Sequence, residues 1–431
     1  MMEKFDVIVV GAGPAGLAAA YTTAKAGLKT IIFERGEYPG SKNVMGGVLY
    51  RQATEEVFPD FWRHAPLERP IVEQNYWFLS QKSAVKLGYR SEEFGEEPYN
   101  NFTVLRAKFD RWLAKQVEQA GALLITETVV EELLREGNQV VGVRTGRSEG
   151  DLHAPLVIIA EGVNSLLVQQ LGLRDDIAPQ HLAVAVKEII SLPQEKIEDR
   201  FNLEKGQGAV IELIGEPSYG VMGTGFIYTN KESISIGVGA ILSEVVKHKW
   251  NPNDLLENMK KHPSVRPLIE GSELKEYLAH LIPEGGYKAM PKIYAPGVLV
   301  IGDAAMLVNG IHREGSNLAI MSGKFAAETV IDAHRAGDFS LQMLARYQQR
   351  LENSFVLQDL KKYQNSTGLF EENPQYFQEY PEMLNDIFHE FFTIDSVPKQ
   401  KKQQLMLAKL KQRRGYGQIA LDLYKLWRAL G

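Results

Sequence analysis

A glycine-rich stretch near the N-terminus has the residue types and spacing that bind a dinucleotide. The sequence GAGPAG occupies Gly11 to Gly16, and Glu34 lies 18 positions beyond Gly16. Gly11 permits a tight turn, Gly13 lets the backbone approach a pyrophosphate, and Gly16 lets a helix pack closely on a strand. A carboxylate at the position of Glu34 can accept hydrogen bonds from ribose hydroxyls. The stretch is therefore expected to bind an adenine dinucleotide.

The segments around this stretch are those that must position it. Residues 5–10, FDVIVV, form a largely apolar run that is typical of a buried parallel strand. The sequence LAAAYTTAKAG predicts a helix that ends at Gly27, and KTIIFE predicts a second strand that ends at Glu34. The free N–H groups and the positive dipole end at the start of the helix favour phosphates. Strand, turn, helix and second strand fit within about 30 residues, as the dinucleotide-binding unit requires.

A second set of residues, far along the chain, favours FAD over NAD. A short apolar strand ends at Gly302-Asp303, and a helix is predicted to begin near Gly315-Ser316-Asn317. FAD is long, so another part of the same fold must hold its ribityl chain and ring. Gly302 allows close approach, Asp303 can accept a hydrogen bond from a ribityl hydroxyl, and the helix start can direct N–H groups at the flavin edge that becomes negative on reduction. The alternative interpretation is that Asp303 only caps a helix.

Composition excludes several classes of protein. The chain has 431 residues, which predicts two or three domains, and a net charge of −6, which argues against a general nucleic-acid binder. The absence of cysteine excludes disulfides, cysteine-ligated clusters and Cys nucleophiles on this chain. The sequence has no run of about 18 apolar residues, and its N-terminus leads directly into a strand. We therefore expect a cytoplasmic protein without metal, and contact with a membrane surface stays open.

The remaining regions predict an acceptor domain and a helical C-terminus. Residues 180–290 are rich in alternating strand patterns, whereas 253–280 within them favour helix. Such a sheet is expected to cover the flavin ring and form the acceptor pocket. A second GxGxxG unit is absent, so electrons are expected either from another protein or from a nicotinamide bound without its own domain.

The C-terminal hundred residues change charge sharply. Residues 366–395 contain seven Asp or Glu and no Lys or Arg, whereas 396–431 contain nine Lys or Arg and one Asp. The basic segment can be a solvated helix, a dock for an acidic ferredoxin-like subunit or an anionic-lipid contact. Helical spacing places five apolar side chains on one face, which is either a core stripe or a membrane or partner face. These are Leu384, Ile387, Phe388, Phe391 and Phe392.

Several motifs together resemble one family of flavoproteins. LRAKFDRWLA, AEGVNS and IGDAA, with the N-terminal unit, resemble the geranylgeranyl reductase and para-hydroxybenzoate hydroxylase-type FAD superfamily. GSKNVMGGVLY, GFIYTNKESISIGVG and GIHREGSNLAIMSG are similar to the FixC subfamily, whose members are relatives of electron transfer flavoprotein–quinone oxidoreductase. The resemblance covers residues 5 to about 395. It implies an α/β fold with a discontinuous Rossmann-like FAD-binding domain of glutathione reductase type, a β-sheet quinone domain and a helical C-terminal region.

The resemblance also implies boundaries and site residues. The FAD-binding domain would comprise 1–75, 104–170 and 291–335, the quinone domain 76–103 and 171–290, and the helical region 336–431, for partner or membrane docking. The implied FAD contacts, with Val130 acting through its backbone, are Gly11, Gly13, Ala15, Gly16, Glu34, Arg35, Gly46, Gly47, Arg106, Val130, Gly162, Gly302, Asp303, Gly315, Ser316 and Asn317. His312 either relays a proton to quinone or only shapes the loop. Lys42 and Asn43 are further candidates for contact with flavin or acceptor.

The resemblance implies a place in an electron-transfer complex. A FixC-like subunit would hold FAD non-covalently, receive electrons from FixA/FixB-like electron transfer flavoprotein alpha and beta subunits, and reduce membrane quinone. A ferredoxin-like FixX-type subunit would carry the [4Fe–4S] cluster, the complex would oxidise NADH by electron bifurcation, and the chain would sit peripherally on the cytoplasmic face of the membrane.

Three alternatives stay open beside the quinone oxidoreductase. A geranylgeranyl reductase-like enzyme would reduce isoprenoid double bonds, an aromatic hydroxylase would need a surface for NAD(P)H, and FAD could be only a structural support. The first class tends to carry a Tyr-x-Trp-x-Phe-Pro-like signature. The corresponding sequence here, SYGVMGTGFIYTNKESISIGVG, has neither tryptophan nor a Phe-Pro pair.

Overall fold

The computed structural model describes residues 4–42 and 45–431, which divide into two compact units. The first unit takes its residues from 1–68, 100–181 and 282–364, and the second comprises 69–99, 182–281 and 365–431. Each unit is therefore assembled from segments that lie far apart in the sequence. Asn43, one of the candidates named above, lies outside the described residues.

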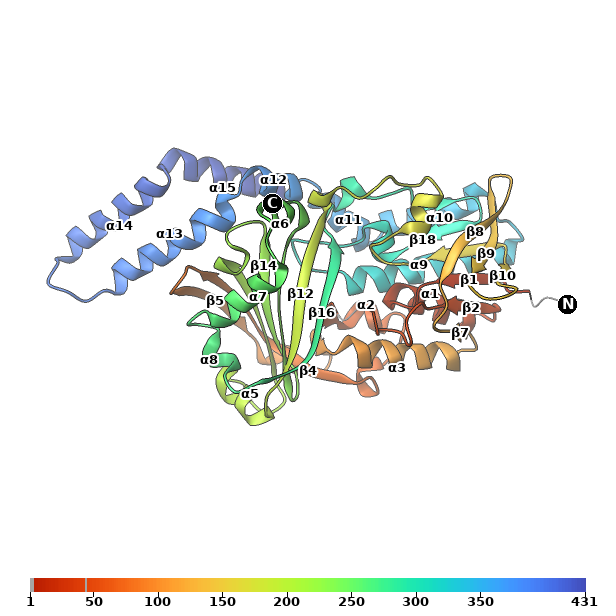
Figure 1. The fold of residues 1–431 in the computed structure, drawn as a ribbon, viewed down its shortest axis with the longest axis horizontal. Coiled ribbons are helices and arrows are strands. Elements are labelled where there is room, and N and C mark those ends of the chain that lie inside the picture. The colour runs from red at the N-terminus through yellow and green to blue at the C-terminus, as the bar shows by residue number, and fades with distance from the viewer. Residues whose placement is uncertain (1–3, 43–44) are drawn as a thin grey trace. The chain divides into compact units, whose positions relative to one another are not determined.

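A six-stranded sheet forms the centre of the first unit (Figure 1), in the order β17-β18-β11-β1-β2-β7. The strands are β1 (Val7–Val10), β2 (Thr30–Phe33), β7 (Leu123–Ile125), β11 (Leu156–Ile159), β17 (Tyr294–Ala295) and β18 (Val298–Val300). Only the β17–β18 pair among these neighbours is antiparallel. Every residue of β1, β2, β11 and β18 is buried, as their apolar sequences predict for parallel strands covered on both faces.

Helices cover this sheet, and one of them brings a segment from the second half of the chain against the first helix. α1 (Pro14–Lys25) follows β1, and α9 (Ser316–Ala336) crosses α1 so closely that a Cβ on Gly323 would lie 2.2 Å from the carbonyl oxygen of Ala15. Since real Cβ contacts do not reach such distances, the crossing requires glycine at this point. It fixes the start of α9 relative to the glycine-rich turn.

The other elements of the first unit surround the sheet. β3 (Val48–Tyr50) pairs antiparallel with β6 (Asn101–Val104), and a separate three-stranded sheet has the order β10-β9-β8. These three strands are β8 (Val130–Glu136), β9 (Gln139–Thr145) and β10 (Asp151–His153). The remaining helices are α2 (Arg51–Glu55), α3 (Arg106–Gln119), α4 (Leu166–Gln170), α10 (Leu341–Glu352) and α11 (Phe355–Lys362).

The second unit is built on a larger sheet with the order β16-β12-β15-β14-β13-β4, and β5 pairs with β4. Its strands are β4 (Leu67–Leu79), β5 (Ala84–Arg90), β12 (Leu182–Ser191), β13 (Gly208–Gly215), β14 (Gly223–Thr229), β15 (Ser233–Ile241) and β16 (Glu273–Pro283). A core that includes Trp77, Ile211, Ile236 and Met259 packs this sheet against helices. Helices α5 (Gln194–Phe201), α6 (Leu242–His248), α7 (Pro252–Lys261) and α8 (Arg266–Ile269) contribute to this core. The unit also contains α12 (Ser366–Glu372), α13 (Gln375–Phe392), α14 (Lys399–Arg413) and α15 (Tyr416–Leu430).

One secondary-structure prediction is wrong. Residues 253–280 were expected to be helical, but the helices end with α8 and the segment continues as the strand β16. β16 lies at the edge of the sheet beside β12, and most of its side chains between 273 and 281 are exposed. The sequence ELKEYLAHL is rich in helix formers, so its strand conformation comes from pairing with β12 rather than from intrinsic preference.

The reversal of charge near the C-terminus is explained by a helical hairpin. The acidic α13 and the basic α14 lie side by side (Figure 1) and are joined by ion pairs. Lys409 Nζ lies 2.6 Å from Glu390 Oε1, and Arg413 Nε lies 2.7 Å from Asp386 Oδ2. Some basic side chains of α14 therefore form ion pairs with acidic side chains of α13. This interpretation was not among the alternatives considered from the sequence.

The boundaries of the units differ from the predicted ones. α10 and α11 belong to the first unit, since Tyr347 of α10 is buried and its hydroxyl donates to the carbonyl oxygen of Val300 at 3.0 Å. Residues 365–431 belong to the second unit, where the Asn385 side chain donates to the carbonyl oxygen of Phe78 at 2.9 Å. The helical C-terminal region is thus divided between the two units rather than separate from both.

Candidate functional site

The glycine-rich turn has the geometry that its sequence predicts. Gly11 has a φ of 102°, which L side chains rarely adopt, and a Cβ on Gly16 would lie 1.9 Å from the carbonyl oxygen of Gly11. A Cβ on Gly13, by contrast, would meet nothing within 4 Å. The turn therefore closes tightly against the first residues of α1 while the backbone at Gly13 faces open space.

Glu34 ties this turn to the end of β2. Its carboxylate accepts hydrogen bonds from the backbone N–H of Ala12 at 3.0 Å and from that of Gly36 at 2.7 Å. A carboxylate has about four acceptor positions, so it can still accept from a ribose. Arg35 is exposed beside it. Val130 begins β8, a short distance along the chain from Thr128, whose N–H donates to the carbonyl oxygen of Glu34 at 2.9 Å.

Gly302 and Asp303 lie at the same edge of the sheet as the turn. They begin the 3₁₀-helix η6 (Gly302–Ala305), directly after β18. A Cβ on Gly302 would lie 3.0 Å from the Cβ of Ala15, and the Gly302 N–H donates to Ser322 Oγ of α9 at 3.0 Å. The carboxyl ends of parallel strands form the edge where ligands bind in such folds. Residues separated by almost 300 positions therefore meet at one place.

A buried arginine lies in the same region. Arg106, 5% exposed, donates to both carboxylate oxygens of Asp110, at 2.8 Å and 2.7 Å, and to the carbonyl oxygen of Met45 at 2.7 Å. Burial disfavours the charged guanidinium, but Asp110 and, more weakly, Asp303 outweigh burial and raise the pKa of Arg106. The arginine is therefore a fixed positive charge, and three of its N–H groups already donate hydrogen bonds within the protein.

Gly46 lies between Arg106 and the start of α9. A Cβ on Gly46 would lie 3.1 Å from Arg106 Nη1 and 3.1 Å from Ser316 Oγ, so any side chain there would crowd both groups. Gly47, the next residue, accepts through its carbonyl oxygen from the N–H of Val104 at 2.9 Å. Glycines at 46 and 47 thus let the segment before β3 pass close to the α9 N-terminus.

Buried polar atoms in this region lack a partner within the described chain. They are Oδ1 of Asn317, Nδ2 of Asn309 and Oγ of Ser41, although the Asn317 side chain also hydrogen-bonds Glu314. Buried polar atoms are normally satisfied, and a bound polar molecule is one way to satisfy them. Together with the open space at Gly13 and the tight fit at Gly46, these atoms fit a long polar cofactor such as FAD.

Two carboxyl groups in this region have raised pKa values. Burial raises the pKa of Asp303 to about 6, and Arg106 partly offsets this. Burial and the negative charge of Asp303 raise the pKa of Glu284 to about 7. Neither Glu284 nor Asp110 was among the sequence candidates. The spacing of Arg106 and Asp110, four residues apart on one helix, was a signal that could have identified the pair.

Other predicted residues lie in the same unit but are positioned differently. Gly162, with a φ of 76°, follows the end of β11, and a Cβ there would meet nothing within 4 Å. His312 is exposed, and its Nε2 lies 2.9 Å from the hydroxyl of Tyr363. Its carbonyl oxygen accepts from the hydroxyl of Tyr50 at 3.4 Å. The loop that carries His312 is thus held from two sides.

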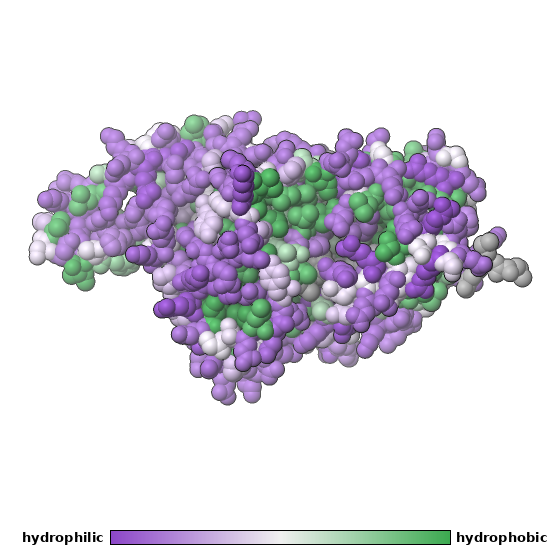
Figure 2. Space-filling model, viewed as in Figure 1, coloured by the Kyte–Doolittle hydropathy of each residue, from purple (hydrophilic) through white to green (hydrophobic). Residues whose placement is uncertain are grey.

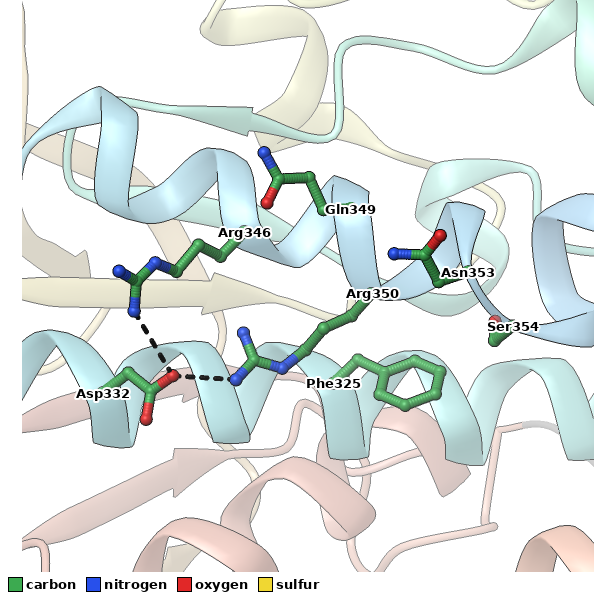
Figure 3. A pocket seen from close by; sticks show the side chains of 7 residues that line it. All are labelled: Phe325, Asp332, Arg346, Gln349, Arg350, Asn353 and Ser354. Atoms are coloured by element: carbon green, nitrogen blue, oxygen red, sulfur yellow. Dashed lines mark hydrogen bonds and ion pairs between the residues drawn. The ribbon is translucent and has the colours of Figure 1, made fainter.

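A surface hollow of about 440 Å³ lies elsewhere in the first unit, between α9 and α10 (Figure 3). Asp332 lies 2.8 Å from Arg350 Nη2 and 3.8 Å from Arg346 Nη1, and Glu328 lies 3.2 Å from Arg350 Nε. Two acidic and two basic side chains therefore balance one another. The hollow is lined by none of the candidate cofactor residues.

Comparison with known proteins decides the family. Residues 366–431 match the model of the ETF-QO/FixC family C-terminal domain, and two models of FAD dependent oxidoreductases match 6–167 and 99–328. Protein FixC of Azorhizobium caulinodans is 49% identical over 430 residues, 99% of each chain. The chain belongs to the FixC and electron transfer flavoprotein–quinone oxidoreductase family. Another relative is "Probable electron transfer flavoprotein-quinone oxidoreductase YdiS" of Escherichia coli K12, 43% identical over 95% of each chain.

The solved structures similar to this FixC-family chain confirm the fold predicted from the sequence. A geranylgeranyl bacteriochlorophyll reductase-like protein from Thermoplasma acidophilum has a TM-score of 0.74 at 21% identity, over 98% of this chain and 99% of its own. The flavin-dependent brominase Bmp2 has a TM-score of 0.67 at 16% identity, over 89% and 92%. The α/β fold of FAD-dependent oxidoreductases, with a helical C-terminal region, is shared. At these identities the likeness concerns the fold.

This FixC-family chain is an FAD-dependent oxidoreductase. FAD, when bound, supplies a ring that accepts and releases electrons. Within residues 4–42 and 45–431, no group of three His, Asp or Glu side chains is arranged to hold a metal ion. No helix in that part of the chain is long and apolar enough to cross a bilayer.

Proposed function

We propose that the residues gathered around the glycine-rich turn hold FAD non-covalently. The backbone at Gly13 and the start of α1 bind the pyrophosphate, and Glu34 accepts from the adenosine ribose. Asp303 accepts from the ribityl chain. The N–H groups at the start of α9, beside Ser316, face the flavin edge that gains charge on reduction. The fit is supported by Gly46, where any side chain would crowd both Arg106 and Ser316.

The protein then transfers electrons from an electron transfer flavoprotein to quinone. The observation that carries this proposal is the similarity to YdiS, which extends over 95% of both chains. FAD suits the reaction because it can take electrons singly and deliver two. Exposed His312, held by Tyr363, is proposed to relay a proton to the quinone.

The proposed partners are an iron–sulfur subunit and the two subunits of an electron transfer flavoprotein. Its sequence contains no cysteine, so a [4Fe–4S] cluster would reside on a separate ferredoxin-like FixX-type subunit. FixA- and FixB-like electron transfer flavoprotein subunits would deliver electrons, and the complex would oxidise NADH by bifurcation on the cytoplasmic face of the membrane. Similarity to proteins named FixC over nearly their full length supports this assembly.

The end of the α13–α14 hairpin is proposed as the peripheral membrane contact. Phe388, Phe391 and Phe392 are 40%, 59% and 70% exposed, so these three residues of the predicted apolar face are not buried in a core. Ile394, which follows α13, is 94% exposed. Hydrophobic residues are visible at this end of the hairpin in Figure 2. Exposed lysines at positions 399 and 401 follow at the start of α14, where they can contact anionic headgroups.

Replacing Phe391, Phe392 and Ile394 by serine is expected to weaken binding to anionic vesicles by tenfold or more. Full burial of one such side chain contributes roughly 1.5–3 kcal/mol, and a tenfold change needs about 1.4 kcal/mol. Vesicle co-sedimentation measures the change. Serine at Leu423 and Tyr424 of α15, which are about as exposed as Phe391, is the control and should leave binding unaltered. Equal binding by the triple variant and the natural chain would remove the hairpin end from the membrane contact.

A second candidate function is the reduction of isoprenoid double bonds. It is considered because the chain shares its fold, at a TM-score of 0.74, with a geranylgeranyl bacteriochlorophyll reductase-like protein. Purification of the chain from native membranes, with visible absorbance read on the eluate, separates the two. Flavin bands with a co-purifying electron transfer flavoprotein pair and a small iron–sulfur protein support the quinone oxidoreductase. Flavin bands on a solitary chain favour the isoprenoid reductase.

A further inference from the structure

The last helix of the second unit, α15, turns an apolar face toward solvent. Helical spacing places five exposed residues on this face, which are Tyr416, Ala420, Leu423, Tyr424 and Trp427. The exposed fractions of Leu423, Tyr424 and Trp427 are 58%, 54% and 69%, and the rings of the last two lie 6.2 Å apart. A surface helix normally places its apolar stripe against the core. The orientation of α15 is therefore the reverse of the usual one.

A polar network holds α15 in this orientation. Asp422 lies on the opposite side of the helix, is 1% exposed, and its carboxylate accepts from the Tyr380 hydroxyl at 2.8 Å and the Gln375 amide at 3.1 Å. The Tyr376 hydroxyl donates to its backbone carbonyl oxygen at 2.6 Å, and the Arg414 guanidinium binds its carboxylate. Rotation of the helix to bury its apolar face would break these bonds and leave a buried charge unpaired. The apolar face therefore stays outside.

This face is separate from the hairpin end that is proposed to contact the membrane. The polar network ties α15 to the first turns of α13, where Gln375 and Tyr380 lie, whereas Phe391 and Phe392 lie in its last turn. α13 has 18 residues, so its two ends are about 27 Å apart. A contact made by the hairpin end with lipid therefore does not cover α15.

The charges beside the face favour an acidic partner. Arg428, next to Trp427, and Lys411, near the end of α14, are exposed, and neither forms an ion pair within the described part of the chain. Residues 396–431 contain one acidic residue, Asp422, and it is buried. A second copy that packed α15 against α15 would bring basic side chains together without exposed acidic ones from α14 or α15 to pair with them. Charge complementarity thus disfavours a symmetric contact between copies.

The nearest acidic side chains outside the hairpin do not change this conclusion. Glu371 and Glu372, at the end of α12, are exposed. They precede Asn373, whose side chain accepts from Lys425 Nζ at 2.9 Å. Helical spacing places Lys425 on the side of α15 away from Trp427. These carboxylates are therefore associated with the other side of the helix.

We infer that the outer face of α15 docks an acidic protein, the small iron–sulfur subunit of the proposed complex. This inference rests on the proposed function. Leu423, Tyr424 and Trp427 supply the apolar contact, and Arg428 and Lys411 pair with acidic side chains around it. Exposed aromatic residues and arginine are the types that contribute most to protein–protein binding. A 15-residue helix is about 22 Å long and about 10 Å wide, which suits the small interfaces of electron-transfer partners.

The family comparison supports a role for this segment that is not shared by all flavoproteins. The model of the ETF-QO/FixC family C-terminal domain matches 366–431, the segment that contains α15. The two models of FAD dependent oxidoreductases match 6–167 and 99–328, and so do not include it. A partner specific to this family is therefore expected to bind a segment specific to it.

The test is calorimetric titration of the FAD-loaded chain with the purified iron–sulfur subunit encoded by the same organism. Leu423→Ser with Trp427→Ser is expected to weaken binding tenfold or more, because central aromatic contacts are lost. Arg428→Glu is expected to weaken binding by about tenfold at low salt and by less at high salt, because salt screens exposed charges. Leu407→Ser, at a 52% exposed position of α14, and Lys261→Glu, at the exposed end of α7, are matched controls that should leave the affinity unaltered.

Substitutions at exposed positions should leave the thermal midpoint and the bound FAD as in the natural chain. Equal affinity of the natural chain and the double variant for the iron–sulfur subunit would overturn the inference. A double variant that retains the subunit but loses binding to anionic vesicles, to the electron transfer flavoprotein or to a second copy of the chain would also overturn it, and would assign the face to that partner. A natural chain that does not bind the iron–sulfur subunit at all would overturn the proposed complex, and this inference with it.

Discussion

Replacing Arg106 by alanine is expected to lower the stability of the first unit by about 3–5 kcal/mol, because it leaves a buried charge without its partner. Asp110, 1% exposed, loses two hydrogen bonds of 2.7–2.8 Å, and the carbonyl oxygen of Met45 loses its donor. At about 2–4 °C per kcal/mol, the thermal midpoint should fall by roughly 6–20 °C. Differential scanning calorimetry of the FAD-loaded protein measures the change.

The matched control removes both partners of the pair. Arg106→Met with Asp110→Leu leaves no uncompensated charge and should recover most of the lost stability, because apolar side chains of similar volume can replace a buried ion pair. The double variant should still bind FAD more weakly than the natural chain if Arg106 lies beside the cofactor. A single Arg106→Ala variant as stable as the natural protein would show that the buried pair contributes little.

Replacing Asp303 by alanine is expected to reduce FAD affinity by about 10- to 100-fold. A hydrogen bond to a charged group contributes roughly 1.5–3 kcal/mol, and every 1.4 kcal/mol is tenfold. Asp303→Asn keeps a neutral acceptor, so its loss should be smaller. Isothermal titration of the apoprotein with FAD compares the two variants. Full affinity in Asp303→Ala would remove this residue from the cofactor site.

Because of the raised pKa of Asp303, the affinity of the protein for FAD is also expected to depend on pH. The ionised carboxylate is the stronger acceptor, and burial raises the pKa of Asp303 to about 6. The contribution of this residue to FAD binding is therefore present above pH 6 and is lost as the pH falls through about 6. Asp303→Asn has no proton to gain, so its affinity should not show that decrease. The same titration repeated across pH distinguishes the two proteins.

The geometry of the glycine-rich turn could be predicted in detail because its requirements are local. The steric conditions at Gly11, Gly13 and Gly16 follow from a strand, a tight turn and a helix that are adjacent in sequence. The meeting of Gly302 with Ala15 could be expected only from the rule that ligand sites form at the carboxyl edge of parallel strands. That rule gives the edge but not the individual contacts.

The features that were missed depend on pairing between distant segments. β16 has the composition of a helix but takes its conformation from β12, and the basic α14 finds its acidic partner in α13. Glu284 stands in a Pro-Glu-Gly-Gly sequence that indicates only a turn. Its proximity to Gly310 and Asp303 depends on how η6 and the following loop fold within the first unit. Local sequence patterns carry no information on such contacts.

The central claim is that this flavoprotein receives electrons from an electron transfer flavoprotein and passes them to quinone. The most direct test is anaerobic stopped-flow mixing of the FAD-loaded chain with the reduced electron transfer flavoprotein encoded by the same organism, followed by addition of a soluble quinone. The visible flavin absorbance of the chain should decrease on the first mixing and return when quinone is added, with quinol formed in equal amount. Flavin absorbance that is unchanged by the reduced donor, or that fails to return with quinone, would contradict the claim.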